Sequence, residues 1–151
     1  MPDQELFARA AEGKLTSDDE LRRQVERLLK DPKADAFVDD FTEQWLGLRD
    51  LEDLNPDEDL FPQYDSKLKM SSTAETQSFV REILRHDLSL LSLLDSDFLM
   101  LDERMARHYG IDGVRGDAFR RVSLPPESDR GGLLTQASVL PVTSDGFRTL
   151  P

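Results

Sequence analysis

Four oxygen-bearing side chains alternate along an acidic stretch of the chain, as the first calcium ligands of an EF-hand loop do. They are Asp53, Asn55, Asp57 and Asp59. An EF-hand loop has a turn glycine at its sixth position and a bidentate glutamate at its twelfth, where this chain has Glu58 and Tyr64. We therefore expect no dedicated metal site, and these four residues are weak candidates for an adventitious cation only.

The two histidines are the next candidates for acid–base or metal chemistry. Glu82 and His86 are four residues apart, so their side chains share one face of a helix. His108 lies near the end of another predicted helix, where a protonated imidazole complements the helix dipole. The repeated Glu-x-x-His signature of di-iron bundles is absent from the sequence. We expect structural or surface roles for both histidines.

Motifs for nucleophilic catalysis, nucleotide binding and haem attachment are missing from the sequence. The chain has no cysteine, which excludes a thiolate zinc site, a cysteine nucleophile and a C-x-x-C-H haem motif within it. It also has no G-x-S-x-G elbow, no P-loop and no G-x-G-x-x-G fingerprint. The catalytic residues, if there are any, are therefore unknown from sequence, and no cofactor is expected within this chain.

The charge of the chain bears on its partners. Its formal net charge is −12 at pH 7, from 31 acidic and 19 basic residues. Such a surface repels nucleic-acid phosphates and anionic lipids, so neither is expected as a partner. The longest apolar-looking stretch, residues 88–101, is interrupted by serines and aspartates and is too short to span a bilayer. We expect no membrane insertion.

Helix signals dominate the first 110 residues, and glycine and proline become frequent after them. The sequence predicts a mainly α fold, an irregular helical bundle with a glycine- and proline-rich, partly extended C-terminal tail. Expected helices cover residues 3–11, 18–30, 33–48, 73–86, 87–94 (short and mostly buried), 103–109 (capped by Asp102 and stopped by Gly110) and 132–139. Residues 50–62 are expected to be an irregular loop, and residues 119–124 a short extended segment.

Two helices carry apolar stripes that predict buried faces. Leu21, Val25, Leu28 and Leu29 recur with helical spacing in the first of them. The stripe of the next helix consists of Phe37, Val38, Phe41, Trp45, Leu46 and Leu48. Because Trp45 shares this stripe, we expect the single tryptophan of the chain to be a core anchor rather than a ligand-stacking residue.

The most distinctive stretch begins at Arg130 and reads RGGLLTQASVL, followed by TSDGFRT from residue 143. Its glycines permit close backbone approach, and its small hydroxyl residues suit turns and caps. Arg130 and Arg148 can pair with carboxylates or bind an anion. A structural turn is the interpretation we favour.

This stretch resembles the opening of a domain of unknown function in large, multi-domain planctomycete-type cytochrome c proteins. Three upstream segments are similar to the preceding domain of the same proteins: AAEGKLTSDDELRRQVERLLKDPKADAFVDDFTEQWLGL, NPDEDLFPQYDSKLKMSSTAET and LLSLLDSDFLMLDERMARHYGI. Asp102 stands where the family often has asparagine, and Leu150 replaces a small polar residue near the end. Together the resemblance covers nearly the whole chain, in order.

The resemblance implies that the chain is a piece of a larger protein, exported or periplasmic, whose haem c lies in another part. It implies a helical domain of unknown function over residues 1–128 and the truncated start of a following domain over 129–151. We expect a non-catalytic scaffold or docking module whose partners are neighbouring domains of the parent, with a homo-oligomer of the piece also open. The alternative is part of an oxidative enzyme acting on polysaccharide or another extracellular substrate. That alternative predicts a cleft in which His86 or His108 meets carboxylates and Arg130 or Arg148.

Overall fold

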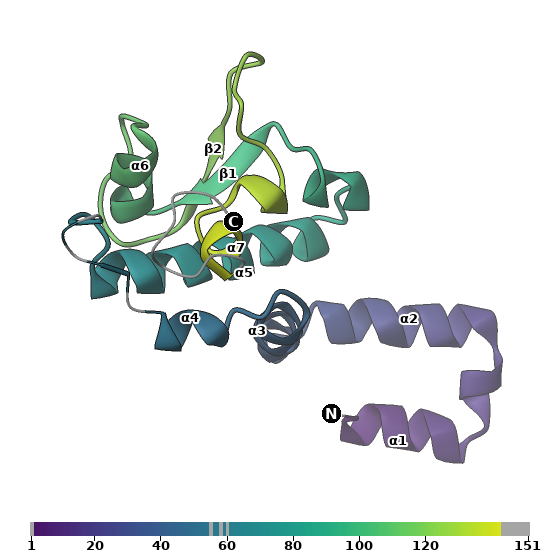
Figure 1. Ribbon diagram of the computed structural model, residues 1–151. Coiled ribbons are helices and arrows are strands. Elements are labelled where there is room, and N and C mark those ends of the chain that lie inside the picture. The colour runs from purple at the N-terminus through teal and green to yellow at the C-terminus, as the bar shows by residue number, and fades with distance from the viewer. Residues whose placement is uncertain (1, 55, 58, 60, 143–151) are drawn as a thin grey trace. The chain divides into compact units, whose positions relative to one another are not determined.

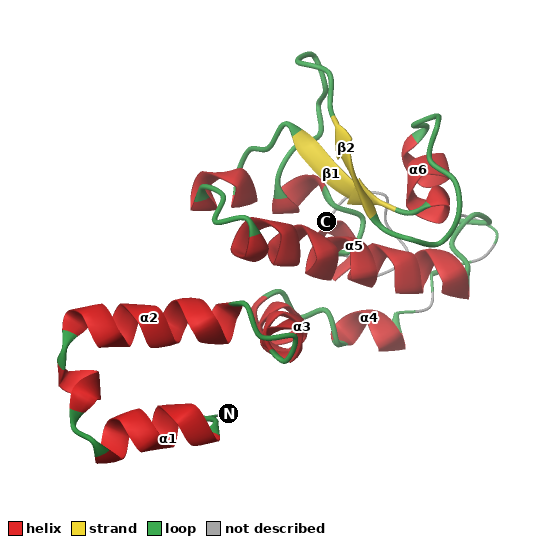
Figure 2. Cartoon of the chain, turned by 180° about the vertical axis from the view of Figure 1, so that it is seen from behind, coloured by secondary structure: helices red, strands yellow, loops and turns green. Residues whose placement is uncertain are grey.

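The computed structural model describes residues 2–54, 56–57, 59 and 61–142 of the chain. The chain divides into two compact units, Met1–Ala36 and Phe37–Pro151, and each is described by itself. The described residues are mainly helical, with one small sheet (Figures 1 and 2), so the predicted mainly α class is confirmed at that level.

The first unit is a helical hairpin in which α1 (Gln4–Ala11) and α2 (Asp18–Leu29) run antiparallel, joined by the short 3-10 helix η1 (Lys14–Thr16) (Figure 1). Helix α1 begins where the carboxylate of Asp3 accepts a 2.9 Å hydrogen bond from the Leu6 N–H. Gly13 turns the chain at a positive φ of 68°. Both helices were predicted from sequence, and the structure confirms them.

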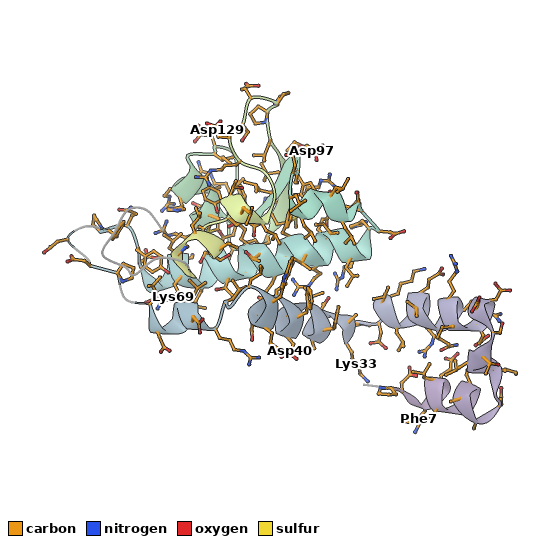
Figure 3. The ribbon with its side chains drawn as sticks, turned by 45° about the vertical axis from the view of Figure 1, so that its right-hand side comes forward. Phe7, Lys33, Asp40, Lys69, Asp97 and Asp129 are labelled. Atoms are coloured by element: carbon orange, nitrogen blue, oxygen red, sulfur yellow. The ribbon has the colours of Figure 1, made fainter. Side chains whose placement is uncertain are left out.

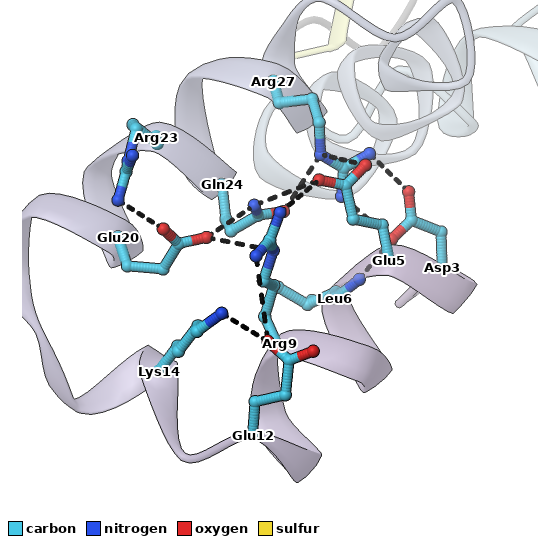
Figure 4. A network of polar contacts seen from close by, with 10 residues as sticks. All are labelled: Asp3, Glu5, Leu6, Arg9, Glu12, Lys14, Glu20, Arg23, Gln24 and Arg27. Atoms are coloured by element: carbon cyan, nitrogen blue, oxygen red, sulfur yellow. Dashed lines mark hydrogen bonds and ion pairs between the residues drawn. The ribbon is translucent and has the colours of Figure 1, made fainter.

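Polar side chains fill the interior of this hairpin (Figure 4). Arg27 donates two hydrogen bonds, of 2.6 and 2.9 Å, to the carboxylate of Asp3. Glu20 and Gln24 are buried, and the Gln24 amide donates to Glu20 Oε1 at 3.0 Å. Arg9 reaches the same Oε1 at 3.4 Å. Charge-assisted hydrogen bonds therefore hold the two helices where an apolar seam was expected.

The apolar stripe predicted as the buried face of α2 is exposed. Leu21, Val25 and Leu29 lie on the surface and Leu28 is half-buried. Glu20 and Gln24 of the same helix are buried. The prediction was wrong because helical periodicity identifies a face without identifying what covers it. Here the satisfied polar network takes the interior of the hairpin.

The second unit begins within α3 (Ala34–Trp45) and continues through α4 (Asp50–Asp53) to the long helix α5 (Ser66–Arg85). Helix α4 lies within residues 50–62, which were expected to be an irregular loop. Leu51 of this short helix is buried. Helix α5 begins at Ser66 rather than near residue 73: Asp65 caps it by accepting a 2.6 Å hydrogen bond from the Leu68 N–H. The serines taken for caps are instead buried inside the helix.

A two-stranded antiparallel sheet lies along α5 (Figures 1 and 2). Strand β1 (Phe98–Leu101) is wholly buried and pairs with β2 (Arg120–Ser123), with Phe98 opposite Ser123. The prediction of an extended segment is confirmed by β2, whereas β1 was not predicted. Helix α6 (Glu103–Tyr109) has the predicted Asp102 cap and Gly110 stop.

The core of the second unit consists of two neighbouring clusters. One gathers Leu68, Leu99, Leu101, Met105, Ala106 and Val114. The other gathers Phe79, Ile83, Phe98, Met100 and Leu133, with the Phe79 and Phe98 ring centroids 5.0 Å apart. The core therefore forms between α5, the sheet, α6 and the tail segment that contains Leu133.

The segment predicted as a mostly buried helix over residues 87–94 is different in the structure. Only a 3-10 turn, η2 (Leu90–Leu93), forms there. Leu90, Leu91 and Leu94 are exposed. The prediction was wrong because an apolar run shows that side chains can be buried without showing which elements cover them.

The tail contains η3 (Leu133–Thr135) and α7 (Val139–Val142) in place of one short helix over 132–139. Both belong to the second unit. The domain boundary expected after residue 128 stays a prediction; the contacts divide the chain elsewhere, between Ala36 and Phe37. Of the helices in the described ranges, none combines the length and apolarity that crossing a bilayer requires.

Candidate functional site

Helix α3 presents three aromatic side chains to solvent. Phe37, Phe41 and Trp45 are 55, 42 and 50% exposed. Neighbouring ring centroids are 5.7 and 5.3 Å apart, with interplanar angles of 20° and 29°. These three residues are called the aromatic stripe below. The expectation that Trp45 anchors the core is therefore wrong.

The reason lies in which face of α3 packs inward. Val38 and Thr42, each one residue after a stripe position, are buried. The Thr42 hydroxyl donates a 2.8 Å hydrogen bond to the Val38 carbonyl, which lets a polar side chain occupy this inner face. The aromatic stripe is rotated away from that face by about 100°, the angle between consecutive helix residues.

The border of the aromatic stripe is acidic. Asp40 projects from α3 into solvent (Figure 3). Arg49 donates to Asp40 Oδ1 at 3.1 Å and to Glu43 Oε2 at 3.0 Å. On a different face of α3, Asp39 accepts a 2.6 Å hydrogen bond from Arg81 on α5. The surface beside the aromatic stripe thus combines exposed rings with carboxylates.

The second feature is the way the distinctive tail stretch is held. A Cβ added at Gly131 would lie 2.7 Å from the Ser96 carbonyl oxygen, and one at Gly132 would lie 2.4 Å from that of Leu94. Gly132 also has a positive φ of 71°. The two glycines therefore serve close contact with the backbone of residues 94–96, in agreement with the structural turn expected from sequence.

Buried hydrogen bonds join the same stretch to α5. The Thr76 hydroxyl lies 2.5 Å from both Gln136 Oε1 and Ser138 Oγ. All three side chains are fully buried. A buried polar group needs such partners, so these bonds fix the register of the tail on the helix.

A buried acid lies beside them. Glu75 has no exposed surface, and its Oε2 accepts a 2.7 Å hydrogen bond from the Tyr109 hydroxyl. The Tyr109 oxygen in turn accepts from the Ala137 N–H at 2.8 Å. Burial raises the pKa of Glu75 to about 8, and burial together with Glu75 raises the pKa of Tyr109 well above its usual range. Both groups are therefore protonated at neutral pH.

Arg130 covers the outer side of this cluster. Its guanidinium carbon lies 3.9 Å from the centroid of the Tyr109 ring, and its Nη1 donates a 3.0 Å hydrogen bond to the Thr135 carbonyl. Tyr109 and Arg130 also line an open cleft of about 610 Å³. The buried cluster and the cleft therefore meet at these two residues.

The histidines lie in different environments. His86 ends α5 and approaches Glu82 on the same helix at 3.5 Å. His108 is adjacent to Tyr109, with the two ring centroids 5.3 Å apart. Partial burial, and to a smaller extent the positive charges of Arg104 and Arg130, lower the pKa of His108. Arg148, invoked by the enzyme alternative, lies outside the described residues.

The weak cation candidates do not gather around one point. Asp53 ends α4, and Asp57 accepts a 2.8 Å hydrogen bond from the Asp59 N–H. Asn55 lies outside the described residues. Within the described ranges, no three histidine or acidic side chains come together as metal ligands would.

Sequence reasoning missed the residues that carry the buried cluster: Glu75, Thr76 and Tyr109. A signal for the acid was present, because Glu75, Phe79 and Ile83 follow one another at spacings of four and share one helix face. A carboxyl group on an apolar face indicates a buried acid. Its partners come from α6 and the tail and had no such signal.

A family model, PSD4, described as "Protein of unknown function (DUF1592)", matches residues 1–111. Neither a curated protein nor a solved structure matches the chain.

Proposed function

Because this chain belongs to the DUF1592 family of proteins of unknown function, we propose a role built on its own surface, that of a non-catalytic docking module. In this proposal the aromatic stripe of α3 packs against a neighbouring domain of an exported, multi-domain cytochrome c protein. The buried cluster around Glu75 then has the structural task of holding the tail stretch in place.

The observation that carries the proposal is the exposure of Phe37, Phe41 and Trp45 side by side on one helix. Contiguous exposed aromatic groups are uncommon on a monomer and are enriched where proteins associate. Tryptophan and other large aromatic residues also supply much of the binding energy at interfaces. A helix that keeps three of them in solvent, while burying Val38 and Thr42, is suited to docking.

The partner surface follows from the same residues. An apolar helix or strand face is needed to cover the three rings. Lysine or arginine at its border would complement Asp40 and the net charge of −12. Arg49 contacts both Asp40 and Glu43, and its single positive charge neutralises only one of these carboxylates. A basic residue on the partner would pair with the other carboxylate.

The test uses Trp45, because it is the only tryptophan and a member of the aromatic stripe. The probes are the polypeptide segments encoded directly before and after this chain in its gene. Each is produced as a separate polypeptide that contains no tryptophan. Docking is expected to shift the Trp45 emission to shorter wavelength in a saturable way, since the indole leaves water.

Matched variants identify the surface. Phe37→Ser and Phe41→Ser remove exposed rings and should abolish the shift, with little effect on folding. Met70→Ser changes an exposed apolar residue of α5 and should leave the shift intact. Equal titrations for Phe41→Ser and the unmodified chain would overturn the proposal. So would an emission that responds only to the chain's own concentration, which would make a second copy the occupant.

A further inference from the structure

The cleft beside the buried cluster is a feature that the docking role does not use. Its volume of about 610 Å³ falls in the range of small-molecule sites. Its walls include the aliphatic side chains of Ile111, Leu124, Leu134 and Leu140. It therefore combines an aliphatic wall with the polar residues Ser128, Asp129, Arg130 and Thr135.

Arg130 is the cation of this cleft, and its position is constrained. The Tyr109 ring lies beneath its guanidinium group, and Nη1 is bonded to the Thr135 carbonyl. A guanidinium held in this way keeps its other N–H groups for a ligand and loses little freedom when it binds one. Across the described residues, Arg130 forms no ion pair within 4.0 Å.

The charge around Arg130 favours an anion. Burial raises the pKa of Glu75, the acid bonded to the Tyr109 hydroxyl, to about 8, so this acid is protonated at neutral pH and does not neutralise the guanidinium. Among the described residues that line the cleft, the acidic one is Asp129, an exposed side chain on the loop after β2 (Figure 3). A ligand that brings its own carboxylate can form the paired hydrogen bonds that arginine makes best.

We propose that this cleft binds a small aliphatic carboxylate, with the carboxylate on Arg130 and the hydrocarbon chain against Leu124 and Leu134. Both halves of the ligand are required by the geometry. Arg130 supplies orientation, and the aliphatic walls supply the burial of apolar surface that makes binding favourable.

Three probes separate these contributions by NMR or calorimetric titration of the whole chain. Hexanoate carries both the carboxylate and the chain, acetate carries the carboxylate only, and 1-hexanol carries the chain only. Hexanoate is expected to bind saturably and at least about tenfold more tightly than either. If acetate binds as tightly as hexanoate, the site is only an anion contact. If 1-hexanol binds as tightly as hexanoate, the site is only an apolar groove. Either result overturns the proposal.

Variants place the ligand. Arg130→Gln should weaken hexanoate about tenfold or more, because a charge-assisted pair is lost. Arg107→Gln, at an exposed position of α6, should change nothing. Asp129→Asn should strengthen binding by removing repulsion.

Leu134→Ser is a second variant, which tests the cleft even if Arg130→Gln fails to fold. Leu134 is exposed, so its replacement leaves the core untouched while removing part of the wall. It should weaken hexanoate and leave acetate unchanged. Unaltered hexanoate binding in both Arg130→Gln and Leu134→Ser would show that the cleft is not the site.

Discussion

The hydroxyl group of Tyr109 donates a hydrogen bond of 2.7 Å to Oε2 of Glu75, a carboxyl group with no exposed surface. The same hydroxyl accepts from the Ala137 N–H, so one side chain of α6 connects α5 with the tail stretch. The buried site favours the protonated form of Glu75, because an ionised carboxylate would lose its solvation there.

The stability of the chain should therefore depend on pH through Glu75. Burial raises its pKa from 4.5 to about 8, so the folded state holds a proton that the unfolded state releases above pH 4.5. The stabilisation is complete below that pH and is lost as the pH rises to about 8. Between these values the free energy of unfolding should fall by about 1.4 kcal/mol for each pH unit from this group. Urea unfolding at intervals from pH 5 to pH 9 measures the slope.

Glu75→Gln provides the comparison for that slope. Glutamine keeps the shape and an acceptor for Tyr109 but does not titrate, so the variant should lose most of the decline between pH 5 and pH 8. Glu26→Gln, at an exposed position of α2, should retain it. The same decline in Glu75→Gln as in the unmodified chain would assign the effect to other groups.

Gly132 should tolerate alanine poorly. Its φ is positive, and an added Cβ would lie 2.4 Å from the Leu94 carbonyl oxygen, a backbone atom that cannot move without its loop. Gly113 is the matched control, with φ of 89° and nothing within 4 Å of the added Cβ. We expect Gly113→Ala to cost about 1–2 kcal/mol from backbone strain, and Gly132→Ala roughly 1–3 kcal/mol more from the clash. Chemical unfolding of the two variants compares them, and equal losses would contradict the close contact.

Thr76→Val should weaken the attachment of the tail. Valine has the shape of threonine but leaves Gln136 Oε1 and Ser138 Oγ without their buried partner. The expected loss is about 1–3 kcal/mol in the free energy of unfolding. Amide exchange at residues 133–138 should accelerate with it. Thr73→Val, whose hydroxyl bonds only to the preceding turn of α5, should have a much smaller effect.

In the first unit, Asp3→Asn should loosen the hairpin. Asparagine can still cap α1, but it loses the paired hydrogen bonds with the Arg27 guanidinium, which lower the pKa of Asp3 well below its usual range. Amide exchange in α1 should therefore accelerate at low salt. The difference from the unmodified chain should shrink in 1 M NaCl, because salt screens exposed ion pairs. A difference that does not change with salt would indicate loss of the cap instead.

Local features were predictable where the signal and its cause are adjacent in the chain. The Asp102 cap and the Gly110 stop of α6 depend on a few consecutive residues, and the structure has both. The start of α5 was misplaced for the same local reason, since the serines near residue 71 resemble caps while the working cap is Asp65. A cap is identified by the N–H group that it accepts from, and several residues of one stretch can offer an oxygen.

Burial was predicted less well, because it depends on distant partners. Most of the apolar stripe predicted for α2 is exposed, while Glu20 and Gln24 are buried. The stripe predicted for α3 is divided: Phe37, Phe41 and Trp45 are exposed, whereas Val38 and Leu48 are buried together with the polar Thr42. Polar side chains enter an interior when other elements satisfy their hydrogen bonds, and the sequence of one helix does not contain those elements.

By itself the sequence determined the mainly α class, the acidic surface, most helix boundaries and the close-contact role of the tail glycines. Tertiary structure alone decided that Trp45 lies in solvent and that Glu75 lies in the core. It also decided that Tyr109 and Arg130 meet at one cleft. The physical reason is the same in each case: a local pattern sets backbone conformation, whereas exposure, pKa and the convergence of side chains depend on segments far apart in the chain.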